Sequence, residues 1–276
     1  MKNLIFKTVL LAVTSFMTFS LSAQYTLEKL WETDSLLATP ESVLYDAESE
    51  ILFVSNIGDF QKEGSGSVSK VGLDGEITHN QWITGLTATK GMGRYNNLLY
   101  AAEQTTIAVI DTKKGVIIQR IAVEGAQFLN DVTINQNGTL FVSDSRTGKV
   151  HKIDKGNVSV YIEDLNGVNG LLSDGNDLYI LADGKLMKAD NEKNLTTLAE
   201  GIEGGADGIV KINENEFIVT GWEGVIYHIS NSGVKRVLSD TRDEQINSAD
   251  LGYNPADKII YIPTFSKNSV VAYRLK

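Results

Sequence analysis

The segment VTINQNGTLFVSDSRTGKVHKID, residues 132–154, contains the pattern that decides the fold. Two short apolar stretches flank the turn dipeptide Asn137-Gly138, and a third strand-like stretch follows near its end. β-Branched and aromatic residues bounded by turn formers are typical of short antiparallel strands. With the next turn, Lys155-Gly156, and the strand expected over 158–165, residues 132–165 predict one unit of four antiparallel strands.

This unit recurs along the chain. Its second strand has an apolar counterpart in every unit, and these runs begin at residues 51, 98, 140, 178, 217 and 259. The steps between them are therefore 47, 42, 38, 39 and 42 residues. Four strands per unit of about 40 residues, repeated without helical segments, is typical of a β-propeller blade. We predict an all-β fold, a six-bladed β-propeller with four antiparallel strands per blade.

The sixth unit contains only three strands before the sequence ends at Lys276. A spare strand is expected near the other end, over residues 26–33. Pairing it with the last blade would close the ring and cover an edge that otherwise promotes aggregation. A β-sandwich is the alternative, but it predicts neither a regular step nor a spare first strand.

Residues 1–23 differ from the rest of the chain. Lys2 and Lys7 precede an apolar run over 9–19, and small and polar residues follow up to Ala23. This pattern predicts a signal peptide over 1–23 and a propeller domain over 24–276, exported to the periplasm or the extracellular space. A membrane anchor is the alternative, although the run is short for a bilayer span. The chain has no cysteine and therefore no disulfide.

The overall charge restricts the class of partner. The net charge is −10 before the leader is removed and becomes more negative without Lys2 and Lys7. An acidic surface repels nucleic acids and anionic lipids, and the sequence contains no phosphate-binding glycine loop. We expect a soluble protein with a small-molecule substrate, no nucleic-acid partner and no membrane insertion after leader removal. The oligomeric state is not predicted.

Polar residues recur about ten positions before four of the apolar runs. They are Glu41, Asn130, Asn169 and Asp207. In a propeller, equivalent positions of the innermost strands lie at one height around the central channel, so these four side chains should converge. Asn169-Gly170 and Asp207-Gly208 can also be turn dipeptides, which is the structural alternative. However, separate turns at Asn137-Gly138 and Asp174-Gly175 already serve two of these units.

Two carboxylates and two amides facing one narrow space favour a hard cation between them. Carboxylate, carbonyl and water ligands suit Ca²⁺ or Mg²⁺, whereas zinc and copper prefer histidine or cysteine. The histidines, His79, His151 and His228, fall on other strands. We predict a divalent metal site, with Ca²⁺ as the first choice and Mg²⁺ as the alternative.

The same residues resemble the motifs of a known family. The stretches 40–46, 129–131, 168–171 and 206–208 are similar to the senescence marker protein/gluconolactonase (regucalcin-like) family and, more distantly, to paraoxonases and strictosidine synthases. The resemblance implies a six-bladed propeller whose Glu41, Asn130, Asn169 and Asp207 bind the catalytic metal. It also implies hydrolysis of a lactone or related small ester. The chain departs from the family at Phe128, where an arginine is common, and at Ser42, where glycine is preferred.

The resemblance and the chemistry together assign roles to individual residues. Asp207 is the expected general base, because a carboxylate beside the metal can accept a proton from water. Asp131 is expected to orient Asn130 or Asp207, or alternatively to cap a strand start, and Asp250 is a further candidate beside the site. Loops after the apolar runs should form the channel mouth, with the segment 57–64 as a lid and four rim residues, Lys90, Glu103, Trp222 and Phe265.

Two other readings remain open at this point. The first is a non-catalytic propeller that binds a small ligand or a protein partner and has a structural metal. The second is a metal-assisted lyase, which would require a base such as histidine near the metal. Neither His151 nor His228 is placed for that role on its expected strand.

Overall fold

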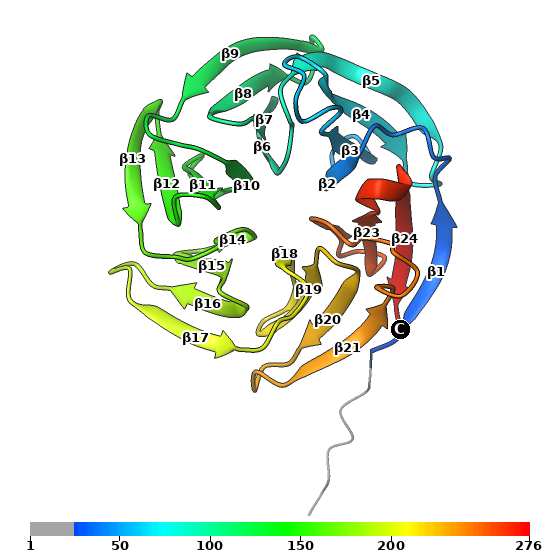
Figure 1. The fold of residues 1–276 in the computed structure, drawn as a ribbon, viewed down its shortest axis with the longest axis vertical. Helices are drawn as coiled ribbons and strands as arrows, with labels where there is room; N and C mark the ends of the chain where they lie inside the picture. Colours follow the sequence, from blue (N-terminus) through cyan, green and yellow to red (C-terminus); the bar gives the residue numbers. More distant parts are fainter. Residues whose placement is uncertain (1–24) are drawn as a thin grey trace, which may run out of the picture.

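The computed structural model describes residues 25–276, which form six four-stranded antiparallel sheets arranged as blades around a central axis (Figure 1). The six-bladed β-propeller predicted from the repeat is confirmed. The first three blades contain β2 (Pro40–Asp46), β3 (Ile51–Asn56), β4 (Gly66–Gly72) and β5 (Ile77–Leu86); β6 (Met92–Tyr95), β7 (Leu98–Ala102), β8 (Thr106–Asp111) and β9 (Val116–Ala122); and β10 (Leu129–Ile134), β11 (Leu140–Asp144), β12 (Lys149–Asp154) and β13 (Asn157–Ile162).

The last three blades follow the same order from the axis outward. Their strands are β14 (Leu171–Asp174), β15 (Asp177–Ala182), β16 (Lys185–Ala189) and β17 (Leu195–Ala199); β18 (Ala206–Asn213), β19 (Glu216–Gly221), β20 (Val225–Ile229) and β21 (Lys235–Asp240); and β22 (Gly252–Asn254), β23 (Ile259–Pro263), β24 (Val270–Leu275) and β1 (Leu27–Glu32). A short 3₁₀-helix, η1 (Phe265–Lys267), lies between β23 and β24.

The second strand of each blade forms the buried layer between neighbouring blades. Each of the six apolar runs contributes a side chain with 0% exposure: Leu52, Leu99, Val142, Ile180, Ile218 and Ile260. Outer strands such as β9 alternate exposed and half-buried positions, because only one face of the outermost strand meets the next blade. The regular step of the apolar runs therefore reflects the regular packing of blade on blade.

The sixth blade closes the ring with a strand from the other end of the chain. β1 pairs antiparallel with β24, from Leu27 opposite Leu275 to Glu32 opposite Val271. Trp31 extends this closure to the first blade: its indole Nε1 donates a hydrogen bond to Leu73 O at 2.8 Å, and its ring lies 5.8 Å from that of Tyr261. The predicted pairing of the first strand with the last blade is confirmed.

The sequence also predicts a signal peptide and no membrane insertion of the remaining chain. The signal peptide predicted over 1–23 lies outside the described residues. Across residues 25–276, no helix has the length and apolar character needed to cross a membrane.

Trp31→Ala tests the closure. We expect the variant to lose about 2–3 kcal/mol of unfolding free energy, because the substitution removes the indole packing and the hydrogen bond to Leu73 O. Trp222→Ala is the matched control, since Trp222 is 40% exposed and closes no blade. Chemical denaturation followed by circular dichroism measures both variants. Equal stability of the two would show that the closure through Trp31 contributes nothing.

Candidate functional site

The four predicted ligands lie at the beginnings of inner strands, where the strand pairing is interrupted. The register between the first two strands of a blade shifts between Pro40 and Ser42, between Leu129 and Val132, and between Ala206 and Ile209. Bulges of this kind re-aim side chains and are common beside active sites. The shifts contain Glu41, Asn130 and Asp207, and Asn169 lies just before β14. The structure thus brings all four residues to the same end of the inner strands.

The glycines that follow two of these residues are required for packing and do not form turns. Neither Gly170 nor Gly208 has a positive φ, so neither adopts the conformation typical of a turn glycine. A Cβ on Gly170 would lie 2.2 Å from Asp207 O, and one on Gly208 would lie 2.6 Å from Asp250 Oδ1. Each glycine therefore allows the next inner strand to approach closely. The turn interpretation of Asn169-Gly170 and Asp207-Gly208 is wrong.

Three of the four predicted ligands are buried, and two are in contact. Glu41, Asn130 and Asp207 are 5%, 8% and 2% exposed. Asn169 Nδ2 donates a hydrogen bond to Asp207 Oδ1 at 2.7 Å, which links the fourth and fifth blades. Asn130 uses its amide nitrogen on Ser145 Oγ at 3.1 Å. The buried oxygens Glu41 Oε2 and Asn169 Oδ1 have no hydrogen-bond partner within residues 25–276.

Asp131 and Asp250 lie beside the predicted ligands, and Asp131 makes the contacts of the alternative expectation, a strand-start cap. Asp131 accepts hydrogen bonds from the backbone N–H groups of Val132 and Leu171, both at 2.6 Å, so it caps the start of β14. No hydrogen bond joins it to Asn130 or Asp207 among the described residues. Asp250 accepts a hydrogen bond from the Ser42 hydroxyl, and its backbone N–H donates to Glu41 O at 3.0 Å. Asp250 is therefore the direct neighbour of the Glu41 strand.

The four carboxyl groups near the predicted ligands all have raised proton affinity. Burial raises the pKa of Glu41 well above its ordinary value, and the charges of Asp207, Asp250 and Asp131 raise it further, while Lys90 acts in the opposite direction. Burial and the Asp250 charge likewise raise the pKa values of Asp131 and Asp207. Burial raises the pKa of Asp250 to about 6. Burial is the main cause of this pattern, and the charges of neighbouring acids add to it at Glu41, Asp131 and Asp207.

The residues present fit a hard divalent cation. The donor set consists of carboxylate and amide oxygens, and two of these oxygens are buried without a donor. A positive ion between them would relieve both the repulsion among the acids and the two unsatisfied acceptors. Histidine, cysteine and carboxylate side chains alone do not make such a site: in residues 25–276, no three of them are grouped so that they could hold a metal. Any cation site here therefore requires the amides of Asn130 and Asn169.

Two of the residues predicted to form the rim are buried. Lys90 is 1% exposed and Glu103 is 3% exposed. Glu103 accepts hydrogen bonds from Thr87 N at 2.8 Å, Thr106 Oγ1 at 2.9 Å and Arg120 Nε at 2.7 Å, so it fixes the loops of the second blade. Its carboxylate is occupied by these three partners. The prediction that Glu103 lines an open mouth is wrong, because these donors hold it inside the blade.

The other two rim residues belong to an exposed aromatic cluster. Trp222 is 40% exposed, and its ring lies 5.3 Å from that of Phe265. Phe60, in the predicted lid segment, lies 6.4 Å from Phe265 and is 48% exposed. Trp222 follows β19, Phe265 follows β23 and Phe60 follows β3, so loops of three blades build the cluster. Trp222 N donates to Gly205 O at 2.8 Å, two residues before Asp207.

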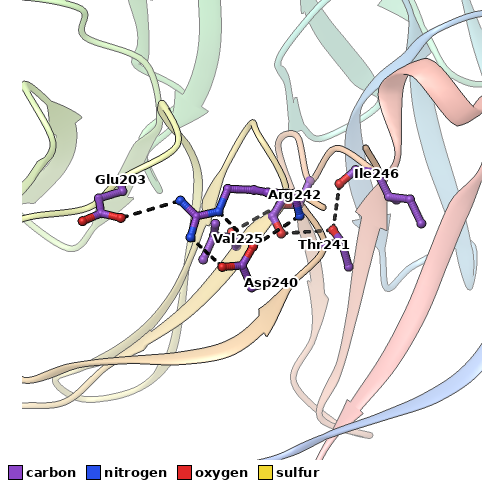
Figure 2. Close-up of polar contacts among 8 residues, drawn as sticks. Glu203, Val225, Asp240, Thr241, Arg242 and Ile246 are labelled. Carbon is purple, nitrogen blue, oxygen red and sulfur yellow. Dashed lines mark hydrogen bonds and ion pairs between the residues drawn. The ribbon is translucent and has the colours of Figure 1, made fainter. Parts of the chain in front are cut away.

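A polar network fixes the two chain segments that lead to Asp207 and Asp250. Arg242 Nη2 pairs with Asp240 Oδ2 at 2.6 Å, and Arg242 Nη1 reaches Glu203 Oε2 at 3.6 Å, in the loop before β18 (Figure 2). Beside it, Thr241 Oγ1 donates to Ile246 O at 2.7 Å (Figure 2). Exposed ion pairs are individually weak, but a connected set restrains the loops that it joins.

A large cavity lies in the channel, on the far side of the ligand positions. Its volume is about 630 Å³, and all six blades line it, through residues such as Val43, Met92, Val132, Leu171, Ile209 and Leu251. It reaches Asp131 and Asp250 but none of the four predicted ligands. Some of its polar groups are paired within the wall; Thr133 Oγ1, for example, accepts a hydrogen bond from Ser173 N at 2.9 Å. We call this space the lower chamber.

The raised pKa of Asp250 leads to a prediction about stability without metal. Its pKa rises from 3.8 to about 6 on folding, so the folded protein binds more protons than the unfolded protein between these values. The unfolding free energy should therefore fall as pH rises through that window. In chelator, Asp250→Asn should be more stable than wild type at pH 7, by on the order of 2 kcal/mol, and no more stable below pH ~4.

Denaturation at both pH values measures this effect, with Asp34→Asn as the control for net charge, because Asp34 is exposed. A less stable Asp250→Asn protein at pH 7 would contradict the cost of burying the Asp250 charge.

Comparisons with known proteins agree with the fold. No family model matches the chain, and no curated protein matches it. Solved structures do: a gluconolactonase from Xanthomonas campestris is 14% identical, with a TM-score of 0.68, over 91% of this chain and 89% of that one. A streptogramin B lyase is 11% identical, with a TM-score of 0.69, over 91% and 98%. Virginiamycin B lyase from Staphylococcus aureus is 10% identical, with a TM-score of 0.66, over 92% and 100%. The chain thus shares its propeller fold with gluconolactonases and with streptogramin B lyases.

Proposed function

We propose that this protein is an exported hydrolase that opens a lactone or related small ester with the help of a divalent cation. Glu41, Asn130, Asn169 and Asp207 would hold the cation, with Ca²⁺ preferred over Mg²⁺. The observation that carries the proposal is the pair of buried oxygens, Glu41 Oε2 and Asn169 Oδ1, left without donors among converging acids. The motif resemblance and the gluconolactonase fold support the choice of reaction.

When bound, the cation would polarise the substrate carbonyl and stabilise the developing negative charge. Asp207 accepts a proton from the attacking water, whose oxygen adds to the acyl carbon. The acyl carbon–oxygen bond then breaks, and the leaving oxygen is protonated to give a hydroxyl group. The products are a carboxylate and an alcohol, joined in one hydroxy acid for a lactone, and one proton is released to solvent.

The surroundings of Asp207 suit a general base. Without a cation, burial and the Asp250 charge raise its pKa, and a bound cation would act in the opposite direction. Asn169 fixes the orientation of the carboxylate through the hydrogen bond to Asp207 Oδ1. This restraint supports the role of Asp207 as the general base.

The aromatic cluster supports a small organic substrate. Trp222, Phe265 and Phe60 offer exposed rings beside the segment that leads to Asp207. Such rings favour the apolar face of a small molecule over a charged polymer. The leader expected over 1–23 would place this activity in the periplasm or outside the cell.

A non-catalytic binding propeller is the second candidate, and the lower chamber favours it. This cavity is large enough for a small ligand, yet it does not reach the four predicted metal ligands. In such a protein the cation would only tie the inner strands together.

Purified mature protein, screened against lactones and aryl esters with and without chelator, distinguishes the two candidates. We expect chelator-sensitive hydrolysis, and Asp207→Asn should lower kcat by about 10²–10⁴-fold because the general base is lost. Asp34→Asn, with the same change of charge at an exposed site, should keep full activity.

Isothermal titration calorimetry of Ca²⁺ and Mg²⁺ accompanies the screen. Metal binding without turnover of any substrate would favour the binding propeller. Hydrolysis that survives both chelator and Asp207→Asn would overturn the proposed mechanism.

A further inference from the structure

Lys90 is a buried lysine beside the candidate metal site. Its side chain is 1% exposed, and it is the sole lysine among the buried residues of the described part of the chain. Lysine is almost never fully buried unless its charge is paired, because removing an ammonium group from water is costly. A position of this kind requires a reason, and the geometry provides one in three steps.

First, Lys90 occupies the position in the second blade that matches those of the four predicted ligands. We call the residues at these matching positions, Glu41, Lys90, Asn130, Asn169 and Asp207, the ring. Lys90 N donates to Ala102 O at 2.9 Å, and Ala102 N donates to Gly91 O at 3.0 Å. The fourth blade repeats this pattern, with Asn169 N bonded to Leu181 O at 2.9 Å and Leu181 N bonded to Gly170 O at 2.8 Å. Lys90 is therefore the counterpart of Asn169, at the same height around the channel.

Second, the carboxylates near Lys90 are not its ion-pair partners. The charges of Glu41, Glu103 and Asp144 all act on Lys90, with Glu41 first, but within residues 25–276 no carboxylate oxygen lies within 4.0 Å of Lys90 Nζ. Glu103 is occupied by Arg120 and two further donors. Asp144 accepts from the backbone N–H groups of Gln127 and Phe128 at 2.9 and 3.0 Å.

Third, the ammonium group is held on one side and has unused donors. Nζ donates one hydrogen bond, to Ala88 O at 2.9 Å, and lies 4.5 Å from the centre of the Phe128 ring. An ammonium group has three N–H donors, and the other two have no partner in the described residues. The Phe128 ring and Ala88 thus fix the position of the charge, and two donors remain for a ligand.

We propose that Lys90 is an anion-binding residue of the channel and that it binds the carboxylate of a small organic acid. This proposal rests on the proposed function, because the opening of an ester creates such a carboxylate. A single buried cation with two free donors matches the two oxygens of one carboxylate. Lys90 would thereby also favour substrates whose acyl group lies next to the second blade, because the new carboxylate then forms beside its ammonium group.

Direct binding tests the proposal without any need for turnover. The probe is 4-hydroxybutyrate, titrated calorimetrically into the full mature protein in Ca²⁺ and again in chelator, with 4-hydroxybutyramide as the uncharged analogue. We expect wild type to bind the carboxylate and to discriminate against the amide. Lys90→Met should weaken carboxylate binding on the order of 30-fold or more, because the buried charge is lost. Lys90→Arg should retain most of it.

Melting temperature provides the control for folding. Lys90→Met replaces a buried charge that has no ion-pair partner within 4.0 Å with an apolar chain of similar length, so in Ca²⁺, where the cation offsets the Glu41 charge, the variant should melt close to the wild-type temperature. A merely structural lysine, which only offsets the charge of Glu41, would give the opposite result: Lys90→Met would melt earlier and bind the carboxylate as wild type does.

The outcomes separate this proposal from the proposed function. Carboxylate binding that depends on Lys90, in a protein without hydrolase activity, would support the anion site and reject the hydrolase. Hydrolase activity with equal carboxylate binding by wild type and Lys90→Met would reject the anion site alone. Failure of wild type to bind 4-hydroxybutyrate at millimolar concentration would also overturn the role of Lys90.

Discussion

The close approach of neighbouring inner strands is the constraint on which the site depends. Residues from separate blades meet around the axis because the positions after Lys90, Asn169 and Asp207 are glycines. A Cβ at Gly91 would lie 2.5 Å from the Asp131 Cα, a separation that packed atoms do not tolerate. The same restriction holds at Gly170 and Gly208. The ring is thus narrow, and its narrowness brings the acids close enough to perturb one another.

Narrowness also explains the electrostatics. Within one channel, the charges of Asp131, Asp207 and Asp250 add to the effect of burial and raise the proton affinity of neighbouring acids. A protein can meet this repulsion by protonation, by a bound cation or by a nearby basic side chain. Lys90 supplies one positive charge, and the two unpartnered oxygens leave room for a second. The Lys90 ammonium group and a bound cation would both offset the charge of the acids. If both proposals hold, the affinity for metal should therefore depend on whether an anion occupies Lys90.

Much of the architecture follows from periodicity in the sequence. The apolar runs, the strand near the beginning of the chain that closes the last blade, and the four polar positions all follow from counting residues, since blades of similar length place equivalent residues at one height. The rule that the channel-facing residue lies about ten positions before the apolar run does not hold in the second blade. The inner strand β6 has four residues and a tight turn at 96–97, so its ring residue lies eight positions before the apolar run and not ten. The spacing therefore predicts Lys90 as a rim residue, although it belongs to the ring.

The error at Glu103 has a different cause. Glu103 is an acidic residue near the site, and its type alone indicates a functional role. Its actual partners are the backbone N–H group of Thr87 and the side chains of Thr106 and Arg120, which come from other strands and loops. No local pattern identifies such partners, because they are set by how loops pack after the blades have formed. The tertiary structure is needed to distinguish an acid that binds a ligand from an acid that holds a loop.

The lower chamber and the ring differ in whether their buried polar groups have hydrogen-bond partners. In the lower chamber, the polar groups of Asp131, Thr133 and Asp250 are paired within the wall, and the rest of the lining is largely apolar. At the ring, Glu41 and Asn169 each keep a buried oxygen without a donor, and Lys90 keeps donors without an acceptor. Buried donors and acceptors without partners lower the stability of the folded protein. Held in fixed positions around the ring, they favour the binding of ligands that carry both charges. This distribution favours the ring over the lower chamber as the place where a charged ligand would bind.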